Sequence, residues 1–165
     1  MLLKKGEKIE RFDAELEKLA EEMVETMRAA DGIGLAAQQI DRDIQLCIVD
    51  VNPGPDSGID FDYDLDGRSP PLDLIMPMAL VNPGIVAASD ARERAEEGCL
   101  SFPDIRGDVE RPAAIEVVFQ DLDGERHQLR CDGLLARCVQ HEVDHLNGIL
   151  FIDRMPARTL QSLKP

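Results

Sequence analysis

The stretch that decides the fold is DGLLARCVQHEVDHLNG, residues 132–148. Asp132 is a suitable N-cap and Gly148 a suitable left-handed stop, so the residues between them are predicted to form a helix. His141 and His145 are four residues apart and therefore lie one turn apart on the same face, about 6 Å along the helix axis. Two imidazoles in this arrangement can reach one metal ion with bonds of about 2.1 Å. The sequence thus predicts a metal site on this helix.

Glu142 stands between the two histidines and completes the pattern HExxH. A carboxylate at this position can reach a water on the metal and act as general base. A catalytic site of this kind also needs a third protein ligand and an open position for the water. Cys138 lies on the same helical face, but it is seven residues before His145, about 10.5 Å of rise, so the two cannot hold one ion. Cys138 is therefore expected to pack or to line the pocket.

The third ligand must come from another segment of the chain. The candidates are Cys47, Cys99, Cys131, His127 and the carboxylates. His127 lies among polar neighbours on a predicted hairpin, which favours an exposed strand histidine. Cys99 follows Gly98 in a segment without a clear helical or strand pattern, and an irregular loop can present both a thiolate and backbone N–H groups. Spacing alone leaves the choice open.

Outward from this helix, the chain reads as short strands and one further helix. Apolar residues recur at three- and four-residue spacing from about 13 to 30, with Asp13 as N-cap, which predicts an amphipathic helix that stops near Gly32. Strands are predicted at 44–51, 74–81, 85–88, 115–121 and 125–131, the last two joined by a two-residue Asp123-Gly124 turn. The expected fold is α+β, a compact single domain with antiparallel β-sheets packed around the central HExxH helix.

Composition excludes several classes of protein. The 165 residues fit one domain, predicted over 1–165 with an acidic insertion at about 52–73 and a short tail at 154–165. A net charge of −15 argues against nucleic acid as a direct partner and against anionic membrane surfaces, because both are bound through Lys and Arg. No run approaches the roughly 20 apolar residues of a membrane span, and no secretory signal is evident. A cytoplasmic protein with four reduced cysteines is expected.

Three segments, taken together, resemble the peptide deformylase family. GIGLAAQQ at 32–39 is similar to the family motif GΦGΦAAxQ, EGCLS at 97–101 matches a second motif, and QHEVDHL at 140–146 matches QHExDHL. The three occur in the family's order, and the resemblance extends from about Phe12 to Asp153. It implies a deformylase-like fold and a single catalytic domain.

The resemblance implies a ligand set and an activity. Cys99, His141 and His145 would bind one divalent metal, with a water in the fourth position. The metal is typically Fe(II), with Ni(II), Co(II) or Zn(II) substituting. The metal-bound water would attack the formyl carbon of an N-formylmethionyl peptide, with Glu142 as general base and then as proton donor to the leaving amine, and formate would be released. A thiolate beside Fe(II) is prone to oxidation, so air sensitivity is expected.

The resemblance also implies how the substrate is held. Gln39 (side-chain amide), Leu100 (backbone N–H) and the metal would stabilise the oxyanion. The extended peptide would lie against bare backbone such as Gly34, and an apolar pocket for methionine would be lined by Ile33, Leu134, Cys138 and His141. Gly98 and Arg106 match family positions near the substrate.

The chain departs from the family at both ends. The usual segment before the first helix is absent, and the chain stops soon after Phe151-Ile152-Asp153, without the C-terminal helix that many bacterial members carry. In some members that tail helps docking to the ribosome, so tethering is not expected of this chain, whereas catalysis is.

Two other functions share part of this sequence pattern. A zincin-type metallopeptidase shares HExxH, but it normally takes a downstream glutamate or histidine as third ligand, and neither occurs after His145. A non-catalytic, metal-binding family member would be signalled by loss of Glu142 or Gln39, and both are present.

One more segment has some features of a binding site. Residues 62–73 fit much of a calcium-binding EF-hand loop, but Pro70 and Pro71 stand where its second helix should begin, and no helical pattern precedes the loop. A solvated acidic turn is the favoured interpretation.

Overall fold

The structure is a computed structural model that describes residues 4–99, 102–150 and 154. Its elements, in chain order, are α1 (Ala14–Ala29), β1 (Gly34–Ala36), the 3-10 helix η1 (Ala37–Ile40), β2 (Leu46–Val49), β3 (Tyr63–Leu65), α2 (Leu72–Ile75), β4 (Met78–Ala88), β5 (Arg92–Cys99), β6 (Phe102–Pro112), β7 (Ala114–Gln120), β8 (Arg126–Asp132) and α3 (Gly133–Leu146). The predicted α+β class is confirmed.

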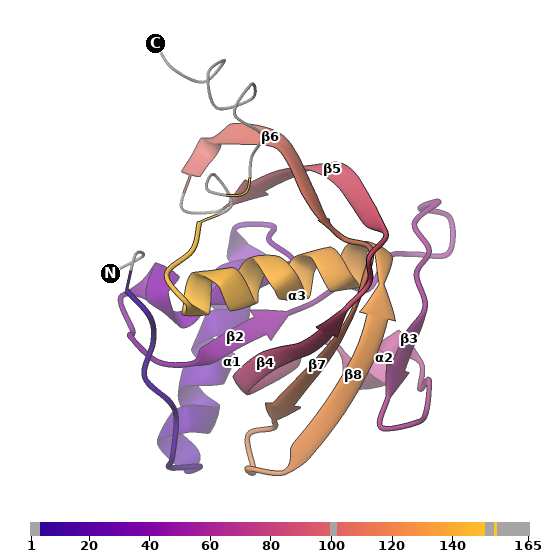
Figure 1. Cartoon of the computed structure of the whole chain (residues 1–165). Coiled ribbons are helices and arrows are strands. Elements are labelled where there is room, and N and C mark those ends of the chain that lie inside the picture. The colour runs from indigo at the N-terminus through magenta and orange to yellow at the C-terminus, as the bar shows by residue number, and fades with distance from the viewer. Residues whose placement is uncertain (1–3, 100–101, 151–153, 155–165) are drawn as a thin grey trace.

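The strands form two separate antiparallel sheets. Six of them pair in the order β1-β2-β4-β7-β8-β3. Within the described chain, β5 and β6 pair only with each other, and we call this hairpin the β5–β6 arm. Figure 1 shows α3 lying across the middle of the fold, with the large sheet on one side and the arm on the other. The prediction of antiparallel sheets around a central HExxH helix is therefore confirmed.

The large sheet is buried on both faces near β2. Cys47 and Val49 of β2 belong to the core cluster that includes α3, whereas Leu46 and Ile48 belong to the cluster that includes α1. This division follows from strand geometry, because successive side chains point to opposite faces. All four side chains are at most 1% exposed. Burial of each such aliphatic side chain stabilises the fold by about 1.5–3 kcal/mol, and the sheet that supports α3 is thereby fixed.

Helix α1 begins and ends as its sequence predicts. The Asp13 carboxylate accepts a hydrogen bond from the backbone N–H of Leu16 at 3.1 Å, which confirms the N-cap. At the other end Asp31 adopts a left-handed φ of 56°, and the N–H of Gly32 donates to the carbonyl of Met27 at 2.9 Å. This ending leads the chain directly into β1.

The start of α3 differs from the prediction. Asp132 occupies the N-cap position, but its side chain makes no capping bond; instead its carboxylate accepts from the backbone N–H of Asp62 at 2.7 Å. Asp132 also ends β8, so its side chain is used to hold the neighbouring segment rather than the helix. At the far end Gly148 adopts the predicted left-handed conformation, with φ 76°.

Three donors converge on the carbonyl of Leu146, the last residue of α3. The backbone N–H of Gly6 donates to it at 2.8 Å, and the side-chain amides of Gln38 and Gln45 donate at 3.2 and 2.8 Å. A helix leaves its last carbonyls without intrahelical partners. The amino-terminal segment, η1 and the segment between η1 and β2 therefore help to fix the end of α3 that carries His145.

The strand predictions for 74–81 and 85–88 need correction. The chain forms the short helix α2 at 72–75, and β4 then runs without a break from Met78 to Ala88. Pro71 stands at the N-cap of α2 and Pro77, which has no N–H, precedes β4. The Asn82-Pro83-Gly84 segment does not end the strand. The pairing of β4 with β7 shifts register between Val81 and Gly84, so the proline is accommodated within the strand. The Asn82 side chain forms hydrogen bonds with the backbone of Ile9 and the side chain of Gln120.

The turn between β7 and β8 is longer than the predicted two residues. The strands end at Gln120 and restart at Arg126, and of Asp123 and Gly124 only the glycine has positive φ. The Asp121 carboxylate accepts from the backbone N–H groups of Asp123 and Glu125, which stabilises the wider turn.

Residues 62–73 do not form a calcium loop. Tyr63–Leu65 is the edge strand β3, which pairs with β8. The carboxylates of this segment bind separate partners: Asp64 accepts from the N–H of Gly67, Asp73 from Asn52, and Asp66 from His127. Their oxygens are therefore not gathered around one point.

His127 links this segment to the β7–β8 turn. Its Nδ1 lies 2.5 Å from Asp66 and its Nε2 lies 2.7 Å from Asp121. Burial lowers the pKa of His127, but the hydrogen bonds and charges of Asp121 and Asp66 outweigh burial and raise it above 6.5. The same contacts lower the pKa of both aspartates from 3.8, although burial opposes this. The predicted exposed strand histidine is instead a half-buried ion-pair partner.

The stabilising effect of His127 should depend on pH. Because its folded-state pKa is raised, its contribution is fully present below about 6.5 and is lost as the pH rises through the folded-state value. Because the aspartate pKa values are lowered, their contribution is present above about 3.8 and is lost on acidification. Urea unfolding of wild type and His127→Gln should give a stability difference that is largest near pH 5–6 and smaller at pH 9. A difference that grows with pH would contradict this.

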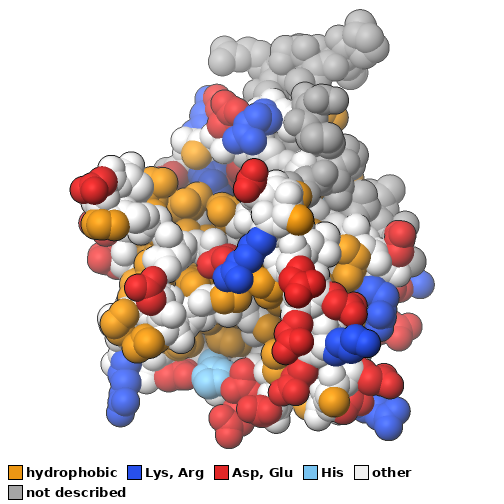
Figure 2. All heavy atoms as spheres, turned by 180° about the vertical axis from the view of Figure 1, so that it is seen from behind, with side chains coloured by type: hydrophobic (Ala, Val, Ile, Leu, Met, Phe, Trp, Pro, Cys, Tyr) orange, Lys and Arg blue, Asp and Glu red, His pale blue; other side chains and the backbone are white. Residues whose placement is uncertain are grey.

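Figure 2 shows the face turned away from the viewer of Figure 1. Apolar side chains gather toward the middle of this face, and acidic side chains spread around them and outnumber basic ones, in keeping with the net charge of −15. None of the helices in the described ranges combines the length and apolar character that a membrane crossing requires.

Candidate active site

A cleft of about 550 Å³ opens between β1, the end of β5 and helix α3. It contains nearly all of the residues that the sequence singled out. Its lining includes Ile33, Gly34, Gln39, Gly98, Cys99, Arg106, Leu134, Cys138, His141 and Glu142. Leu100, the remaining predicted catalytic residue, lies outside the described residues.

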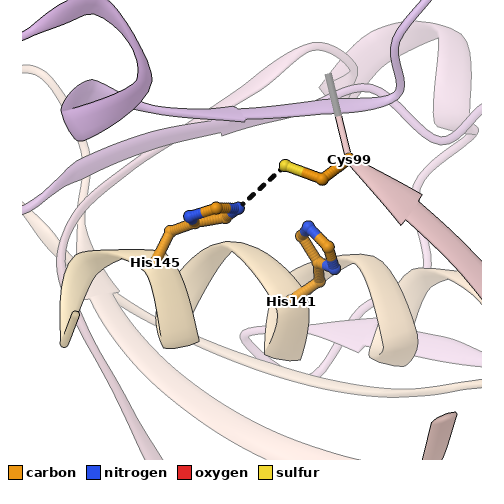
Figure 3. A group of neighbouring side chains, drawn as sticks. All are labelled: Cys99, His141 and His145. Carbon is orange, nitrogen blue, oxygen red and sulfur yellow. Dashed lines mark hydrogen bonds between the residues drawn. The ribbon is translucent and has the colours of Figure 1, made fainter. Parts of the chain in front are cut away.

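Cys99, His141 and His145 meet beside this cleft. One ligand atom of each lies within 4.8 Å of the others, and the Cys99 sulfur is 3.2 Å from Nε2 of His145. All three side chains are buried. Figure 3 shows both rings rising from α3 toward the sulfur, which the end of β5 brings over the helix. The position of Cys99 at the end of a strand corrects the prediction of an irregular loop.

The other candidates for a third ligand lie elsewhere. Cys47 and Cys131 are buried in the main core cluster, and His127 is bound by Asp66 and Asp121 near the turn of the β7–β8 hairpin. Cys138 does not join the group either; its thiol donates to the carbonyl of Ile33 at 3.4 Å and it lines the cleft.

Glu97 orients the ring of His141. Its carboxylate lies 2.9 Å from Nδ1 of His141, so that Nε2 is the ring atom turned toward Cys99. Burial opposes the charge of Glu97, but hydrogen bonds from His141 and Arg111 outweigh burial and lower its pKa to about 2. Metal-binding histidines are commonly oriented through their second nitrogen in this way.

The electrostatics of the group favour a cation. Burial lowers the pKa of His141, but hydrogen bonds to Cys99 and Glu97 and the charge of Glu142 raise it to about 10. For His145, burial and the nearby His141 lower the pKa to about 4, so that this imidazole is neutral at pH 7. The surroundings of His141 therefore stabilise a positive charge, which a bound metal ion would supply in place of the proton.

The three residues fit a metal ion by their chemistry. A thiolate and two imidazoles form a donor set that suits zinc or iron, and their spacing allows bonds of about 2.0–2.3 Å to a common centre. Beside them Oε1 of Glu142 is buried and has no hydrogen-bond partner among the described residues. An unpaired buried carboxylate oxygen is costly unless a ligand or water engages it.

Glu142 is a buried carboxylate with an unusual pKa. Burial raises its pKa to about 7, and the charge of His141 only partly offsets this. A carboxylate with a pKa near neutrality can both accept and return a proton at physiological pH. Glu142 directly follows His141 on α3, so the helix itself holds its carboxylate beside the metal-binding group.

Gln39 is held with its amide group toward the same point. Its Oε1 accepts from the backbone N–H of Ala36 at 2.9 Å, and its Nε2 lies 3.5 Å from the Cys99 sulfur. Because η1 follows β1 directly, the glycine-containing strand and this amide are presented together. The side-chain carbonyl of Gln39 is therefore bound by the backbone of Ala36, and the N–H groups of its amide face the site.

The rim of the cleft contains both apolar and charged groups. Ile33 is 43% exposed although it is apolar, and Leu134 lines the cleft from α3. Arg106 crosses Gly98, where a Cβ would stand 2.6 Å from its guanidinium, and its Nε donates to Glu96. Gly98 therefore allows the arginine to lie across the arm beside the cleft.

Sequence reasoning missed the polar side chains that surround Glu97. Arg111 binds both Glu97 oxygens and also Asp144, and Arg137 donates to Glu97 at 2.6 Å. The one local sign of these buried charges is that charged residues interrupt the apolar positions of α3 and the arm. The same pattern is typical of exposed faces, so it does not indicate burial. Their partners are distant in sequence, so periodicity could not pair them.

A side chain at Gly34 should displace Glu142. A Cβ there would meet the carboxylate of Glu142 and stand 3.0 Å from the Cys138 sulfur. Glu142 is buried on a packed helix, so it cannot move away at low cost. We expect Gly34→Ala to lower kcat at least ~10-fold, since misplacement by about 1 Å can cost ~100-fold, while metal content stays unchanged. Gly84→Ala, in open space, is the matched control; equal rates in both variants would contradict the expectation.

Two helical imidazoles and a thiolate that meet beside an open cleft, with a buried carboxylate in its lining, define a metal-dependent hydrolase of the HExxH class. The profile of the polypeptide deformylase family matches residues 1–161. The chain belongs to the peptide deformylase family.

Relatives and solved structures agree with this assignment. A peptide deformylase from Opitutus terrae is 60% identical over 160 residues, which cover 96% of this chain and 82% of that protein. One from Brucella suis is 44% identical over 147 residues, covering 89% and 74%. The structure of the Synechococcus elongatus peptide deformylase in complex with actinonin matches with a TM-score of 0.80 at 38% identity, covering 98% of this chain and 79% of that one. The Thermotoga maritima peptide deformylase matches with a TM-score of 0.79 at 38% identity, covering 94% and 90%.

Proposed function

We propose that the protein removes the N-formyl group from the N-terminal formylmethionine of nascent polypeptides and releases formate. The observation that carries this is the donor group of Cys99, His141 and His145 beside a cleft that is lined by the buried carboxylate of Glu142. A peptidase is not favoured, because the donor group is completed by a thiolate of the arm and not by a residue downstream of the helix.

Cys99, His141 and His145 would hold one divalent ion, and Fe(II) is the ion we favour. When bound, the ion supplies Lewis acidity that polarises the formyl carbonyl and lowers the pKa of the attacking water. Glu97 keeps Nε2 of His141 directed to the centre, and the low pKa of His145 keeps its ring in the neutral form that can ligate. A thiolate ligand suits Fe(II) and Zn(II) equally, so the choice requires the experiment below.

Glu142 would move the proton. Its Oε1, which has no hydrogen-bond partner in the described part of the chain, is placed to accept a proton from the water that attacks the formyl carbon. With a pKa of about 7, the same group can then deliver that proton to the departing amine nitrogen. One carboxyl thus acts as base in the first step and as acid in the second.

Gln39 would stabilise the negative charge that develops on the formyl oxygen. Its Oε1 is occupied by the N–H of Ala36, so the amide N–H groups face the site before the substrate arrives. Donors that are oriented in advance need no reorganisation in the transition state. The backbone N–H of Leu100 is proposed as the second donor, by resemblance alone.

The peptide would lie in extended form along β1, where Gly34 has no side chain to block it. Ile33, Leu134 and Cys138 line the cleft beside His141 and offer an apolar surface to the methionine side chain. Arg106 and Gly98 would border the remainder of the peptide.

The test is formate release from formyl-Met-Ala-Ser by protein purified without oxygen and loaded with Fe(II), Ni(II), Co(II) or Zn(II). We expect strong turnover with iron or nickel, and no product from the N-acetyl peptide, whose acyl group is larger. Folded, metal-loaded protein that releases no formate would overturn the proposal, and cleavage of the Met–Ala bond would indicate a peptidase instead.

The rate should fall on the acid side of neutrality. Glu142 acts as a base only when ionised, and its pKa is raised to about 7 by burial. The value of kcat/KM should therefore decrease as the pH falls through this region, with a midpoint at or below 7 because a bound cation favours the carboxylate. A profile from pH 5 to 9 checks this; a rate that increases toward pH 5 would exclude Glu142 as the base.

A further inference from the structure

The proposed ligands come from two parts of the fold that share no sheet. Cys99 ends β5 in the β5–β6 arm, whereas His141 and His145 belong to α3. In the described chain the arm pairs with no strand of the large sheet, and α3 packs chiefly against β1, β2 and β8. The distance between the thiolate and the imidazoles therefore depends on the side chains that connect the arm to the helix.

Arg137 makes such a connection. It lies on α3 one turn before His141 and is 9% exposed. Its Nη1 donates to Glu97 at 2.6 Å and to the backbone carbonyl of Val109 at 2.9 Å, and its Nη2 donates to the carbonyl of Glu93 at 2.7 Å. Glu93 belongs to β5 and Val109 to β6. A single planar guanidinium thus binds both strands of the arm at once.

The other connections do not replace these two backbone contacts. Arg111 of β6 binds both oxygens of Glu97 and also Asp144 of α3, so it balances the charge of Glu97 without Arg137 and ties the end of β6 to the helix. Gln140 donates to the carbonyl of Pro112, where β6 ends, and to the carbonyl of Ala136 in its own helix. What Arg137 adds is a direct attachment of the backbone of both strands, at Glu93 and Val109, to α3.

We propose that Arg137 is a positioning residue, which holds the β5–β6 arm over α3 and thereby sets Cys99 at the distance from His141 and His145 that one metal ion requires. This rests on the ligand set of the proposed function. Arg137 takes no part in the reaction; it acts through the arm and through Glu97, which orients His141.

Removal of the Arg137 side chain leaves all three ligands in place in the sequence, but it weakens the attachment of the arm to α3 that brings them together. In Arg137→Leu the carbonyls of Glu93 and Val109 lose a buried donor, and the arm can move away from the helix. We expect the affinity for Co(II) to fall ~10–100-fold, the range found when groups that support metal ligands are removed. Arg92→Leu is the matched control: it removes an arginine from the same arm, where the side chain is exposed and pairs with Glu110, and should change the affinity by less than about twofold.

The experiment titrates metal-free protein with Co(II) and follows the thiolate-to-cobalt charge-transfer band. Hydrogen exchange of the arm amides, residues 92–99 and 102–112, is measured in parallel without metal. In Arg137→Leu the band should appear only at higher Co(II) concentration, and the arm amides should exchange faster than in wild type or Arg92→Leu. Arg137→Lys restores one charge but not the planar fork, so its affinity should lie between those of wild type and Arg137→Leu.

Each outcome decides a separate question. Wild-type affinity and spectrum in Arg137→Leu, even with a lower Tm, would overturn the proposal, because a merely stabilising residue would behave in that way. If Arg137→Leu does not fold, Arg137→Lys decides, and wild-type affinity in that variant also overturns it. Failure of the wild-type protein to show the thiolate band would instead count against the ligand set, and so against the proposed function.

Discussion

Replacing Glu142 with glutamine should abolish turnover while the metal site stays loaded. The amide has nearly the shape of the carboxylate but cannot take a proton, and general acid–base catalysis typically contributes 10²–10⁴-fold. Because Glu142 is proposed to serve both steps, we expect kcat to fall by ~10³-fold or more. Formate release and bound metal, measured on the same preparation, check this. The ligands Cys99, His141 and His145 are unchanged, so metal content should equal that of wild type.

The same variant should be at least as stable as wild type. Burial raises the pKa of Glu142 to about 7, so above that pH the folded protein holds a buried, unfavourable charge. Glutamine removes this charge, and its free energy of unfolding at pH 8 should not be lower than that of wild type. Glu25→Gln, on the exposed face of α1, is the control for the loss of one carboxylate. Turnover at the wild-type rate in Glu142→Gln would exclude Glu142 as the proton carrier.

Replacing Cys99 with serine should remove most of the metal affinity. A serine hydroxyl is a much weaker ligand than a thiolate for iron or zinc. The loss should exceed the roughly 100-fold seen when supporting groups around metal ligands are changed, and formate release at limiting metal should fall in parallel. Metal content after dialysis and isothermal titration with Zn(II) measure the effect.

Cys131→Ala is the control for this variant. Cys131 is buried in the core away from the cleft and was an open candidate for the third ligand. We expect its metal content to equal that of wild type. If Cys131→Ala loses the metal and Cys99→Ser keeps it, the ligand set is wrong.

The parts of the site that are close in sequence could be predicted from the sequence. His141, Glu142 and His145 stand on one helical turn, so their geometry follows from the helix itself. Asp13 as the cap of α1 followed from the same local reasoning, and the structure confirms it. The α+β class also followed, because helices and strands do not alternate along the chain.

The predictions failed where a distant side chain decides the local structure. Asp132 was predicted to cap α3, but its carboxylate binds the backbone of Asp62, a residue 70 positions away. His127 was predicted to be exposed, and Asp66, 61 positions away, binds it. Cys99 was assigned to a loop because β5 is rich in charged residues, and its pairing with β6 shows only in three dimensions. Hydrophobic periodicity does not detect such pairings.

The amino-terminal segment contributes to the site, because Gly6 binds the carbonyl of Leu146 at the end of α3. The N–H of Gly6 joins two glutamine amides on that oxygen, and a Cβ at Gly6 would stand 2.8 Å from the backbone of Ile44, so this residue is tightly enclosed. Trimming the protein past this glycine would leave the helix end with one donor fewer, one residue after His145. Shortened versions made for crystallisation or inhibitor screening should therefore keep the amino terminus intact from Gly6 onward.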